Sequence, residues 1–318
     1  MALPVTILSG FLGSGKTTLL NHLLRAPDRR RYAMVVNDFG SINIDAGLID
    51  QHDGQTMTLS NGCVCCTIGD SFISTLLDLT RQADQFDHVV IEASGVADPA
   101  RLADFAQIDK DLCLDGIIVM ADAGAFCEQY NDPRLTDTIE RQINAADLFV
   151  LNKMDLAKPG QAAQCADILH GYKPDTRIVE TVQAFLPLPL LFGTHGETPL
   201  PAAAHAHTLP FTTWQGKSGE PLDRERLQRF LEALPNEVIR AKGIVYFAGD
   251  ACAHSIQLAG NRLDCRPLKA NPERTASELV IIGVSPFPTD VHLTAQFEWC
   301  VSSAGSDENN SVQPITEL

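Results

Sequence analysis

The sequence predicts a doubly wound, mostly parallel α/β domain followed by a smaller α+β domain. Along residues 1–185, short continuous runs rich in Val and Ile alternate with helical patterns, as expected for parallel strands covered on both faces. From residue 209 onward strand-like runs predominate and few helices intervene, which favours a separate α+β unit. A chain of 318 residues that is 45% hydrophobic is long enough to bury two cores.

Each domain has its own set of expected elements. The first domain should contain six strands, Val5–Leu8, Ala33–Val36, Val89–Ile91, Ile117–Met120, Leu148–Leu151 and Ile178–Val182. The helical patterns between them are Thr17–Arg25, Asp70–Ala83 and Pro133–Ala145. In the second domain a helix over Asp223–Ala233, opened by an Asp cap, accompanies strands Phe211–Trp214, Gly243–Phe247, His254–Leu258 and Leu279–Ile282.

Composition shifts set the expected boundaries. The first domain spans residues 1–185, and a Pro-rich stretch at 186–208 is interpreted as a linker, partly extended. The second domain spans 209–301. Residues 302–318 are polar, lack a core pattern and are predicted to be disordered.

Charge and cysteine usage restrict the class of protein. The net charge is −16, which argues against non-specific nucleic-acid binding and against a basic membrane-binding patch. No apolar run has the length of a membrane span, and no basic region precedes the first apolar stretch. We therefore expect a cytoplasmic protein with neither nucleic acid nor membrane as a partner, in which the nine cysteines are reduced.

A glycine-rich loop predicts a nucleotide site. Residues 10–17, GFLGSGKT, fit the pattern G-x-x-x-x-G-K-[ST] between an expected strand and an expected helix, the context that this motif requires. Glycines allow consecutive backbone N–H groups to point at phosphate oxygens, and the helix adds its positive end. Lys16 would reach the β- and γ-phosphates, and the Thr17 hydroxyl would ligate Mg²⁺.

A second motif favours guanine as the base. Asn152-Lys153-Met154-Asp155 follows the strand expected at 148–151. Guanine presents two neighbouring N–H donors, so the Asp155 carboxylate could accept two parallel hydrogen bonds that adenine cannot offer. Asn152 would contact the base or brace neighbouring loops, and the Lys153 stem would pack on a base face. The motif therefore favours GTP over ATP.

Two further segments are expected to serve Mg²⁺ and the γ-phosphate. Glu92 ends the strand at 89–91 beside the loop, where Mg²⁺ and its waters are held in such sites, and Gly95 would let a backbone N–H approach the γ-phosphate. The polar stretch 37–45 is interpreted as a switch loop. Asp38 and Asp45 are its candidate groups for Mg²⁺ or for positioning water.

Three cysteines are concentrated in the sequence Cys63-Val64-Cys65-Cys66, directly after Asn61-Gly62. Thiolates are soft ligands that suit Zn²⁺ and similar ions, and three of them leave a coordination position open, as metal transfer would need. A redox pair or ordinary core cysteines are the alternatives.

Together these motifs resemble a known family. GFLGSGKTT, NDFGSINID, LSNGCVCC, VIEASGVADP and NKMD occur in the order and spacing of the CobW-type P-loop GTPases, a metallochaperone group, and the segments at 239–246 and 279–283 resemble its C-terminal domain. The resemblance covers roughly residues 4–300. It implies slow hydrolysis of GTP to GDP, coupled to delivery of a metal, often zinc and in some relatives cobalt, to a client metalloenzyme.

The resemblance also implies site residues. Phosphates and Mg²⁺ would be bound by the loop, at Gly10, Gly13, Ser14, Gly15, Lys16, Thr17 and Thr18. Glu92 would serve Mg²⁺, Asn152, Lys153 and Asp155 the guanine, and Cys63, Cys65 and Cys66 the metal cargo. Many members carry N-E-F-G-E where this chain has Asn37-Asp38-Phe39-Gly40-Ser41, so the second acid is lost and the first is shortened.

The sequence is also compatible with other functions. The chain could be a regulatory GTPase that delivers no metal, an activator of a cobalt or iron enzyme such as nitrile hydratase, or a small-molecule kinase, which would not explain Asn152–Asp155. A monomer or weak homo-oligomer is expected.

Overall fold

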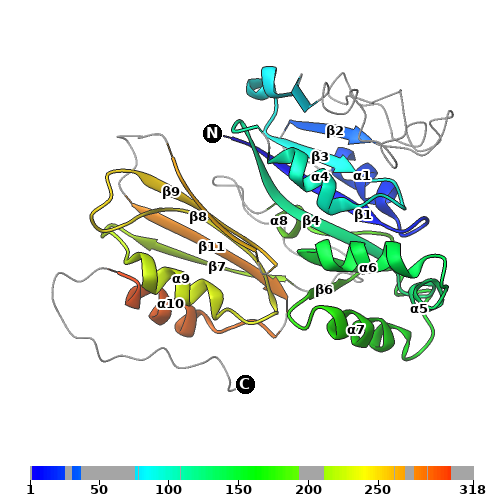
Figure 1. Ribbon diagram of the computed structural model, residues 1–318. Coiled ribbons are helices and arrows are strands. Elements are labelled where there is room, and N and C mark those ends of the chain that lie inside the picture. The colour runs from blue at the N-terminus through cyan, green and yellow to red at the C-terminus, as the bar shows by residue number, and fades with distance from the viewer. Residues whose placement is uncertain are drawn as a thin grey trace. The chain divides into compact units, whose positions relative to one another are not determined.

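A computed structural model describes residues 2–25, 31–36, 76–77, 79–107, 109–192, 211–260, 262–268, 276–284 and 286–301. These residues form two compact units, one built on a six-stranded sheet and the other on a five-stranded sheet (Figure 1).

The first sheet is parallel, with the strand order β2-β3-β1-β4-β5-β6. Its strands are β1 (Leu3–Gly10), β2 (Tyr32–Val36), β3 (His88–Glu92), β4 (Leu112–Asp122), β5 (Leu148–Asn152) and β6 (Arg177–Glu180). All residues of β3 and β5 are buried, which explains why short continuous apolar runs form these strands. The predicted class of the first domain is confirmed.

The helices of this unit lie on both faces of the sheet. They are α1 (Lys16–Arg25), α4 (Pro99–Ala106), α5 (Phe126–Tyr130), α6 (Thr136–Ala145), α7 (Gln161–Tyr172) and α8 (Leu188–Phe192), with a 3₁₀ turn η1 (Ala83–Gln85). The connection from β1 to β2 and that from β3 to β4 run in opposite directions across the sheet. Because such crossovers are right-handed, α1 and α4 cover opposite faces. Accordingly, α4, α6 and α7 share one core cluster with β1 and β4, while the buried leucines of α1 lie outside it.

Several boundaries differ from the expected ones for local reasons. β4 begins at Leu112, earlier than expected, because it pairs with β1 from Leu3 onward. α6 begins at Thr136 and not at Pro133, because the preceding residues form a turn in which the Leu135 N–H donates to Asp132 O (2.9 Å). β6 ends at residue 180, where the chain turns away from the sheet.

Parts of the expected organisation lie outside the described residues. The helix expected over 70–83 is described only from residue 76, with helical geometry at 76–77 and 79–81, and its last residue belongs to η1. The stretch expected to be a partly extended linker begins with the short helix α8, and residues 193–210 are not described. The tail at 302–318 is likewise outside the described residues.

The second unit is an antiparallel sheet, with the strand order β10-β9-β8-β11-β7, against which two helices pack. Its elements are β7 (Phe211–Ser218), α9 (Arg224–Glu232), β8 (Val238–Tyr246), β9 (Ala253–Ala259), β10 (Arg262–Pro267), β11 (Ser277–Val284) and α10 (Asp290–Trp299). Asp223 caps α9, as predicted, by accepting a hydrogen bond from Arg226 N (2.9 Å). Apolar residues of both helices, including Phe230 and Phe297, join the core of the sheet. This confirms the predicted α+β class, whereas β10 and α10 were not expected.

Candidate functional site

The candidate site lies at the carboxyl ends of the parallel strands. Gly10, Glu92, Asp122 and Asn152 are the last residues of β1, β3, β4 and β5. The carboxyl ends of parallel strands meet at one edge of a sheet, and ligands of open α/β sheets bind there. Topology therefore brings together residues that are far apart in the sequence.

The glycine-rich loop between β1 and α1 needs glycine at two positions. Gly10 has φ 133°, and an added Cβ would lie 2.0 Å from Met120 O. Gly15 has φ 107°, and its Cβ would lie 2.3 Å from Asn152 Nδ2. No side chain tolerates such contacts, so only glycine lets the loop pack directly on the ends of β4 and β5. At Gly13 an added Cβ would meet nothing within 4 Å, so space is open over the loop.

The polar groups of the loop suit an anionic ligand. Lys16 is buried, and its Nζ donates to Gly10 O (2.8 Å) and Phe11 O (3.2 Å). The ammonium group therefore lies against the backbone of the loop. The buried Ser14 Oγ has no hydrogen-bond partner among the described residues. Phosphate oxygens could accept hydrogen bonds from both the buried Lys16 ammonium group and the buried Ser14 hydroxyl. Thr18, on the first turn of α1, is exposed.

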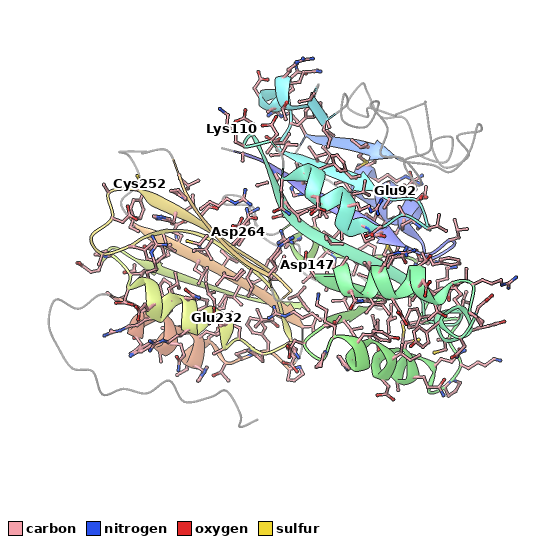
Figure 2. All side chains as sticks on the ribbon, in the orientation of Figure 1. Glu92, Lys110, Asp147, Glu232, Cys252 and Asp264 are labelled. Carbon is pink, nitrogen blue, oxygen red and sulfur yellow. The ribbon has the colours of Figure 1, made fainter. Side chains whose placement is uncertain are left out.

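Thr17 and Glu92 lie together at the start of α1. The Thr17 hydroxyl donates to Glu92 Oε1 (3.2 Å). Glu92 is 2% exposed and is labelled in Figure 2 at the end of β3. Hydroxyl and carboxylate oxygens are the hard donors that Mg²⁺ prefers, so this pair could hold the ion beside the phosphate loop.

Gly95 packs against the phosphate loop and is held by a residue that sequence reasoning missed. An added Cβ at Gly95 would lie 2.8 Å from Leu12 N. Its carbonyl accepts a hydrogen bond from Gln142 Nε2 (3.1 Å), and Gln142 on α6 is buried. The two residues are 47 positions apart, so no local pattern could have indicated the contact.

Asn152 joins the phosphate loop to the turn after β6. Its Nδ2 donates to Ser14 O (2.8 Å), and its Oδ1 accepts from Ala184 N (2.7 Å). Both ends of the buried amide are therefore used within the protein. Of the two expected roles, contact with the base or bracing of loops, this geometry favours bracing.

Lys153 and Asp155 differ in their surroundings. Lys153 has φ 61°, which is uncommon for a residue with a Cβ, and its Nζ pairs with Asp122 Oδ2 (2.8 Å). Asp122 also accepts from Gly124 N (2.9 Å), so it is oriented by two donors. Asp155 is exposed, and its carboxylate is accessible to a ligand.

The turn at residues 181–185 is a further part of this edge, and no sequence motif indicates it. Gln183 and Ala184 both have positive φ (53° and 56°), although neither is glycine. The turn is held by Thr181 Oγ1, which donates to Phe185 O (2.6 Å). His22 Nδ1 lies 3.3 Å from Ala184 O. Consecutive positive φ values at non-glycine residues leave no clear sequence signal.

Some predicted site residues cannot be located. Asp38 and the motif cysteines Cys63, Cys65 and Cys66 lie outside the described residues. Within the residues that are described, no group of three or more His, Cys, Asp or Glu side chains is arranged to hold a metal ion.

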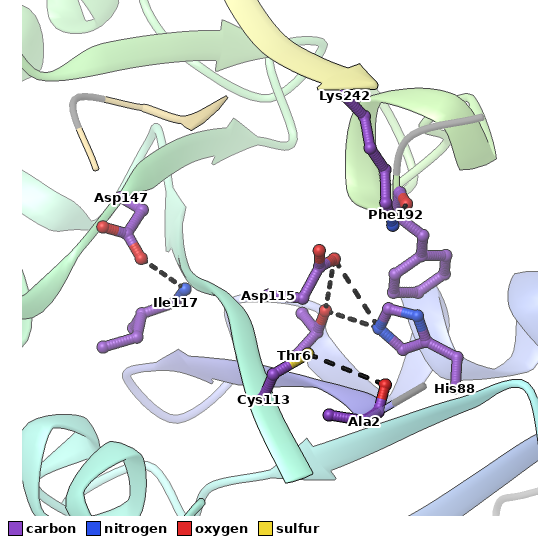
Figure 3. Close-up of polar contacts among 9 residues, drawn as sticks. All are labelled: Ala2, Thr6, His88, Cys113, Asp115, Ile117, Asp147, Phe192 and Lys242. Atoms are coloured by element: carbon purple, nitrogen blue, oxygen red, sulfur yellow. Dashed lines mark hydrogen bonds and ion pairs between the residues drawn. The ribbon is translucent and has the colours of Figure 1, made fainter. Parts of the chain in front are cut away.

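A second polar group is buried at the other end of the strands (Figure 3). Thr6 Oγ1 lies 2.8 Å from His88 Nε2 and donates to Asp115 Oδ2 (3.5 Å). His88 opens β3 and Asp115 lies near the start of β4, so neither faces the edge that carries the phosphate loop. This group links three neighbouring strands and is separate from the candidate site.

The fold and this edge define the first unit as a P-loop nucleotide-binding domain. Its phosphate loop follows the first strand, and an Asn-Lys-x-Asp segment begins at the last residue of β5. In the part of the chain that the structure describes, none of the helices has the length and apolar character of a membrane span.

Comparison with known proteins gives the family. Residues 4–180 match the family described as CobW/HypB/UreG, nucleotide-binding domain, and residues 211–301 match the cobalamin synthesis protein cobW C-terminal domain. The chain therefore belongs to the CobW/HypB/UreG family and is a P-loop GTPase.

Two curated relatives and one solved structure are among the similar proteins. The zinc chaperone CobW of Pseudomonas aeruginosa is 31% identical, over 88% of this chain and 87% of its own. The zinc chaperone YjiA of Escherichia coli is also 31% identical, over 78% of this chain and 83% of its own. A crystal structure of Zn(II)-bound YjiA GTPase from E. coli is 25% identical, covers 95% of this chain and 100% of that chain, and has a TM-score of 0.46.

Proposed function

We propose that this protein is a GTP-hydrolysing metallochaperone that binds a transition metal through Cys63, Cys65 and Cys66 and delivers it to a client metalloenzyme. The observation that carries the proposal is the Asn152 amide, which connects the phosphate loop with the segment expected to bind guanine. A nucleotide at this edge would contact both parts. The zinc chaperones at 31% identity support the metal-carrying half.

In this proposal guanine is recognised by the segment after β5. Asp155 is exposed and accepts the two adjacent N–H donors of guanine. The Lys153 ammonium is held by Asp122, so the lysine stem is available as an apolar surface for one face of the base. Asn152 holds this segment in a fixed position relative to the loop that binds the phosphates.

Phosphate binding and hydrolysis are assigned to the loop and its neighbours. Lys16 moves from the loop carbonyls to the β- and γ-phosphates, and Gly10, Gly13, Ser14, Gly15 and Thr18 complete the phosphate-binding segment. Thr17 and Glu92 hold Mg²⁺, which neutralises charge on the phosphates when bound. Asp38 is proposed to position the attacking water or to serve Mg²⁺, and Gly95 to contact the γ-phosphate. These groups are proposed to promote GTP hydrolysis mainly by positioning the reactants and by stabilising the charge of the transition state.

The cargo is proposed to be Zn²⁺, with Co²⁺ as the alternative. Three thiolates favour a soft or borderline ion, and a fourth position left open permits transfer to another protein. A cytoplasmic location would keep the thiols reduced and able to bind. The client is a metalloenzyme, and the protein acts as a monomer or weak homo-oligomer.

The domain limits are also proposed. A GTPase domain spans 1–185, a Pro-rich linker 186–208 and a CobW-like domain 209–301, followed by a disordered tail at 302–318. The family matches at 4–180 and 211–301 support the first and third limits.

Metal binding is tested by competition with a zinc-specific chelator on reduced protein. Cys65→Ser should lower Zn²⁺ affinity by at least about tenfold, because loss of a ligand costs well over 1.4 kcal/mol. Cys252→Ser, in the second unit, is the matched control and should bind Zn²⁺ normally. Unchanged affinity in Cys65→Ser would contradict the assignment of the site.

The reaction is tested separately by product analysis with GTP and Mg²⁺. Release of free phosphate and GDP, without a phosphorylated acceptor, is expected and would reject the kinase alternative. If GTP is hydrolysed but the reduced protein retains no Zn²⁺ or Co²⁺, the regulatory GTPase without metal delivery is the correct function.

A further inference from the structure

Two cysteines outside the C-x-C-C motif face each other between α5 and α7. Cys127 Sγ and Cys165 Sγ are 3.5 Å apart, within hydrogen-bond distance for sulfur. Cys127 is the second residue of α5, and Cys165 is the fifth residue of α7. The two positions are 38 residues apart, so their proximity comes from the packing of the helices.

The two helices are held together by further contacts on either side of this pair. The hydroxyl oxygens of Tyr130 and Tyr172 are 2.7 Å apart. Gln161 Nε2, at the start of α7, donates to Gly124 O just before α5 (3.1 Å). The sulfur atoms are therefore kept near each other by neighbouring contacts, and they need only a small approach to reach bonding distance.

The two thiols differ in access. Cys165 is fully buried, whereas Cys127 is partly exposed. A small oxidant from solvent would therefore meet Cys127 first, and Cys165 would be the only partner at bonding reach among the described cysteines. This asymmetry is the usual arrangement of a pair in which one thiol is oxidised and a second one resolves it.

We propose that Cys127 and Cys165 form a reversible intramolecular disulfide when a peroxide oxidises the protein. The Cys127 thiolate attacks a peroxide oxygen and cleaves the O–O bond, which yields Cys127 sulfenic acid and a hydroxide or alkoxide ion. That ion takes up the proton lost by Cys127 and leaves as water or an alcohol. The Cys165 thiolate then attacks the Cys127 sulfur, forms the S–S bond and expels hydroxide, which takes up the proton lost by Cys165. Together the two thiols lose two electrons, which reduce the peroxide. A dithiol reductant restores the two thiols.

This modification would act on the edge that carries the nucleotide site. α5 follows Asp122, and α7 follows the segment 152–155, so the disulfide would tie together the helices that continue from two parts of the site. The Cys165 thiol also lies 3.7 Å from Ala123 O, directly after Asp122. The site needs neither bound metal nor the C-x-C-C cysteines, so it goes beyond the proposed function.

The pH dependence follows from the buried thiol. Burial, together with the hydrogen bond to Cys127, raises the pKa of Cys165 to about 12. Cys165 is thus almost entirely protonated near neutral pH, and the fraction of its thiolate rises about tenfold for each pH unit. Burial is the largest cause and persists once Cys127 is a sulfenic acid, so closure of the disulfide should accelerate as the pH rises above 7.

The test is peptide mapping of the full chain after treatment with hydrogen peroxide, thiol blocking and digestion by trypsin without reductant. The disulfide would link the peptide 111–134 to the peptide 154–177, with a mass two hydrogen atoms below their sum. Because Cys113 shares the first peptide, Cys113→Ser is the matched control and should retain the link. Cys165→Ser should abolish it, and dithiothreitol should reverse it in the wild-type protein.

Other outcomes would overturn the proposal. These are absence of the linked peptide in folded wild-type protein, persistence of the link in Cys165→Ser, or loss of the link in Cys113→Ser. A second measurement does not depend on any variant: the rate at which the linked peptide appears in wild type after a peroxide pulse. It should rise from pH 7 to pH 9, and a rate that stays flat or falls would contradict Cys165 as the resolving thiol.

Discussion

Asn152 Nδ2 donates to the Ser14 carbonyl at 2.8 Å and thereby fastens the end of β5 to the phosphate loop. The same amide accepts from Ala184 N, so three segments depend on one buried side chain. Since a polar group left unpaired in the interior is costly, the whole edge should be sensitive to this residue.

Asn152→Ala should therefore weaken both folding and nucleotide binding. It leaves Ser14 O and Ala184 N without their partner, at a cost of about 1–3 kcal/mol for each buried group. We expect a lower melting temperature and GDP affinity reduced by about tenfold or more, measured by differential scanning calorimetry and isothermal titration. Asn131→Ala, at the exposed end of α5, is the control. Wild-type affinity in Asn152→Ala would show that the bracing is unimportant.

Gly15→Ala should abolish measurable nucleotide binding. The new Cβ would collide with the Asn152 amide at 2.3 Å, and φ 107° is unfavourable for alanine. Gly171→Ala is the matched control, because its Cβ meets nothing within 4 Å on α7. The control should bind GDP normally and be more stable by about 0.5–1 kcal/mol, since alanine favours the helix. Equal binding by both variants would argue against the loop geometry.

Asp122→Asn should lower GDP affinity several-fold by releasing the Lys153 ammonium. The Lys153–Asp122 pair is partly exposed, so its effect should be modest and should shrink as salt is added. Asp132→Asn removes a comparable partner from the exposed Arg134 and serves as control. Titrations at low and high salt check the prediction, which fails if Asp122→Asn and Asp132→Asn behave alike.

Gln142→Leu should slow GTP turnover while leaving GDP affinity intact. The Gly95 carbonyl loses its donor, which loosens a segment proposed to contact only the γ-phosphate. Phosphate-release kinetics and GDP titration separate the two effects. The exposed Gln164→Leu on α7 should change neither. If GDP affinity fell as much as turnover, Gln142 would support the structure of the site in general and not the γ-phosphate contact of Gly95 in particular.

Glu92→Gln should raise the Mg²⁺ concentration needed for half-maximal turnover, because an amide is a weaker ligand than a carboxylate. Glu180→Gln is the matched control, since Glu180 also ends a strand of the same sheet but is exposed. Turnover measured across a Mg²⁺ series distinguishes them. If turnover depended on Mg²⁺ identically in Glu92→Gln and in wild type, the assignment of Glu92 to the Mg²⁺ site would be contradicted.

The parts predicted well from sequence are those with local signals. The phosphate loop is predictable because its glycines, Lys16 and Thr17 lie within eight consecutive residues between a strand and a helix. Long-range contacts had no such signal. The Lys153–Asp122 pair depends on β4 and β5 being neighbours, and the Gly95–Gln142 contact depends on α6 packing near the loop.

In the second unit the missed elements also have physical reasons. β10 is an edge strand with charged residues and a terminal Pro267, features typical of protected edges and not of apolar runs. α10 exposes Val291 to solvent (82%) while burying Leu293 and Phe297, so its apolar residues do not form one regular stripe.

The central claim is that one protein couples GTP hydrolysis to metal delivery, which requires that the bound nucleotide changes the affinity for the metal. It is tested most directly by isothermal titration of Zn²⁺ into the reduced protein, once with GDP and once with a non-hydrolysable GTP analogue. The account predicts dissociation constants that differ by about fivefold or more, because the coupling free energy between two sites is typically about 1–3 kcal/mol. Cys65→Ser should lower Zn²⁺ affinity by at least about tenfold in both nucleotide states. Equal constants in the two nucleotide states would contradict it.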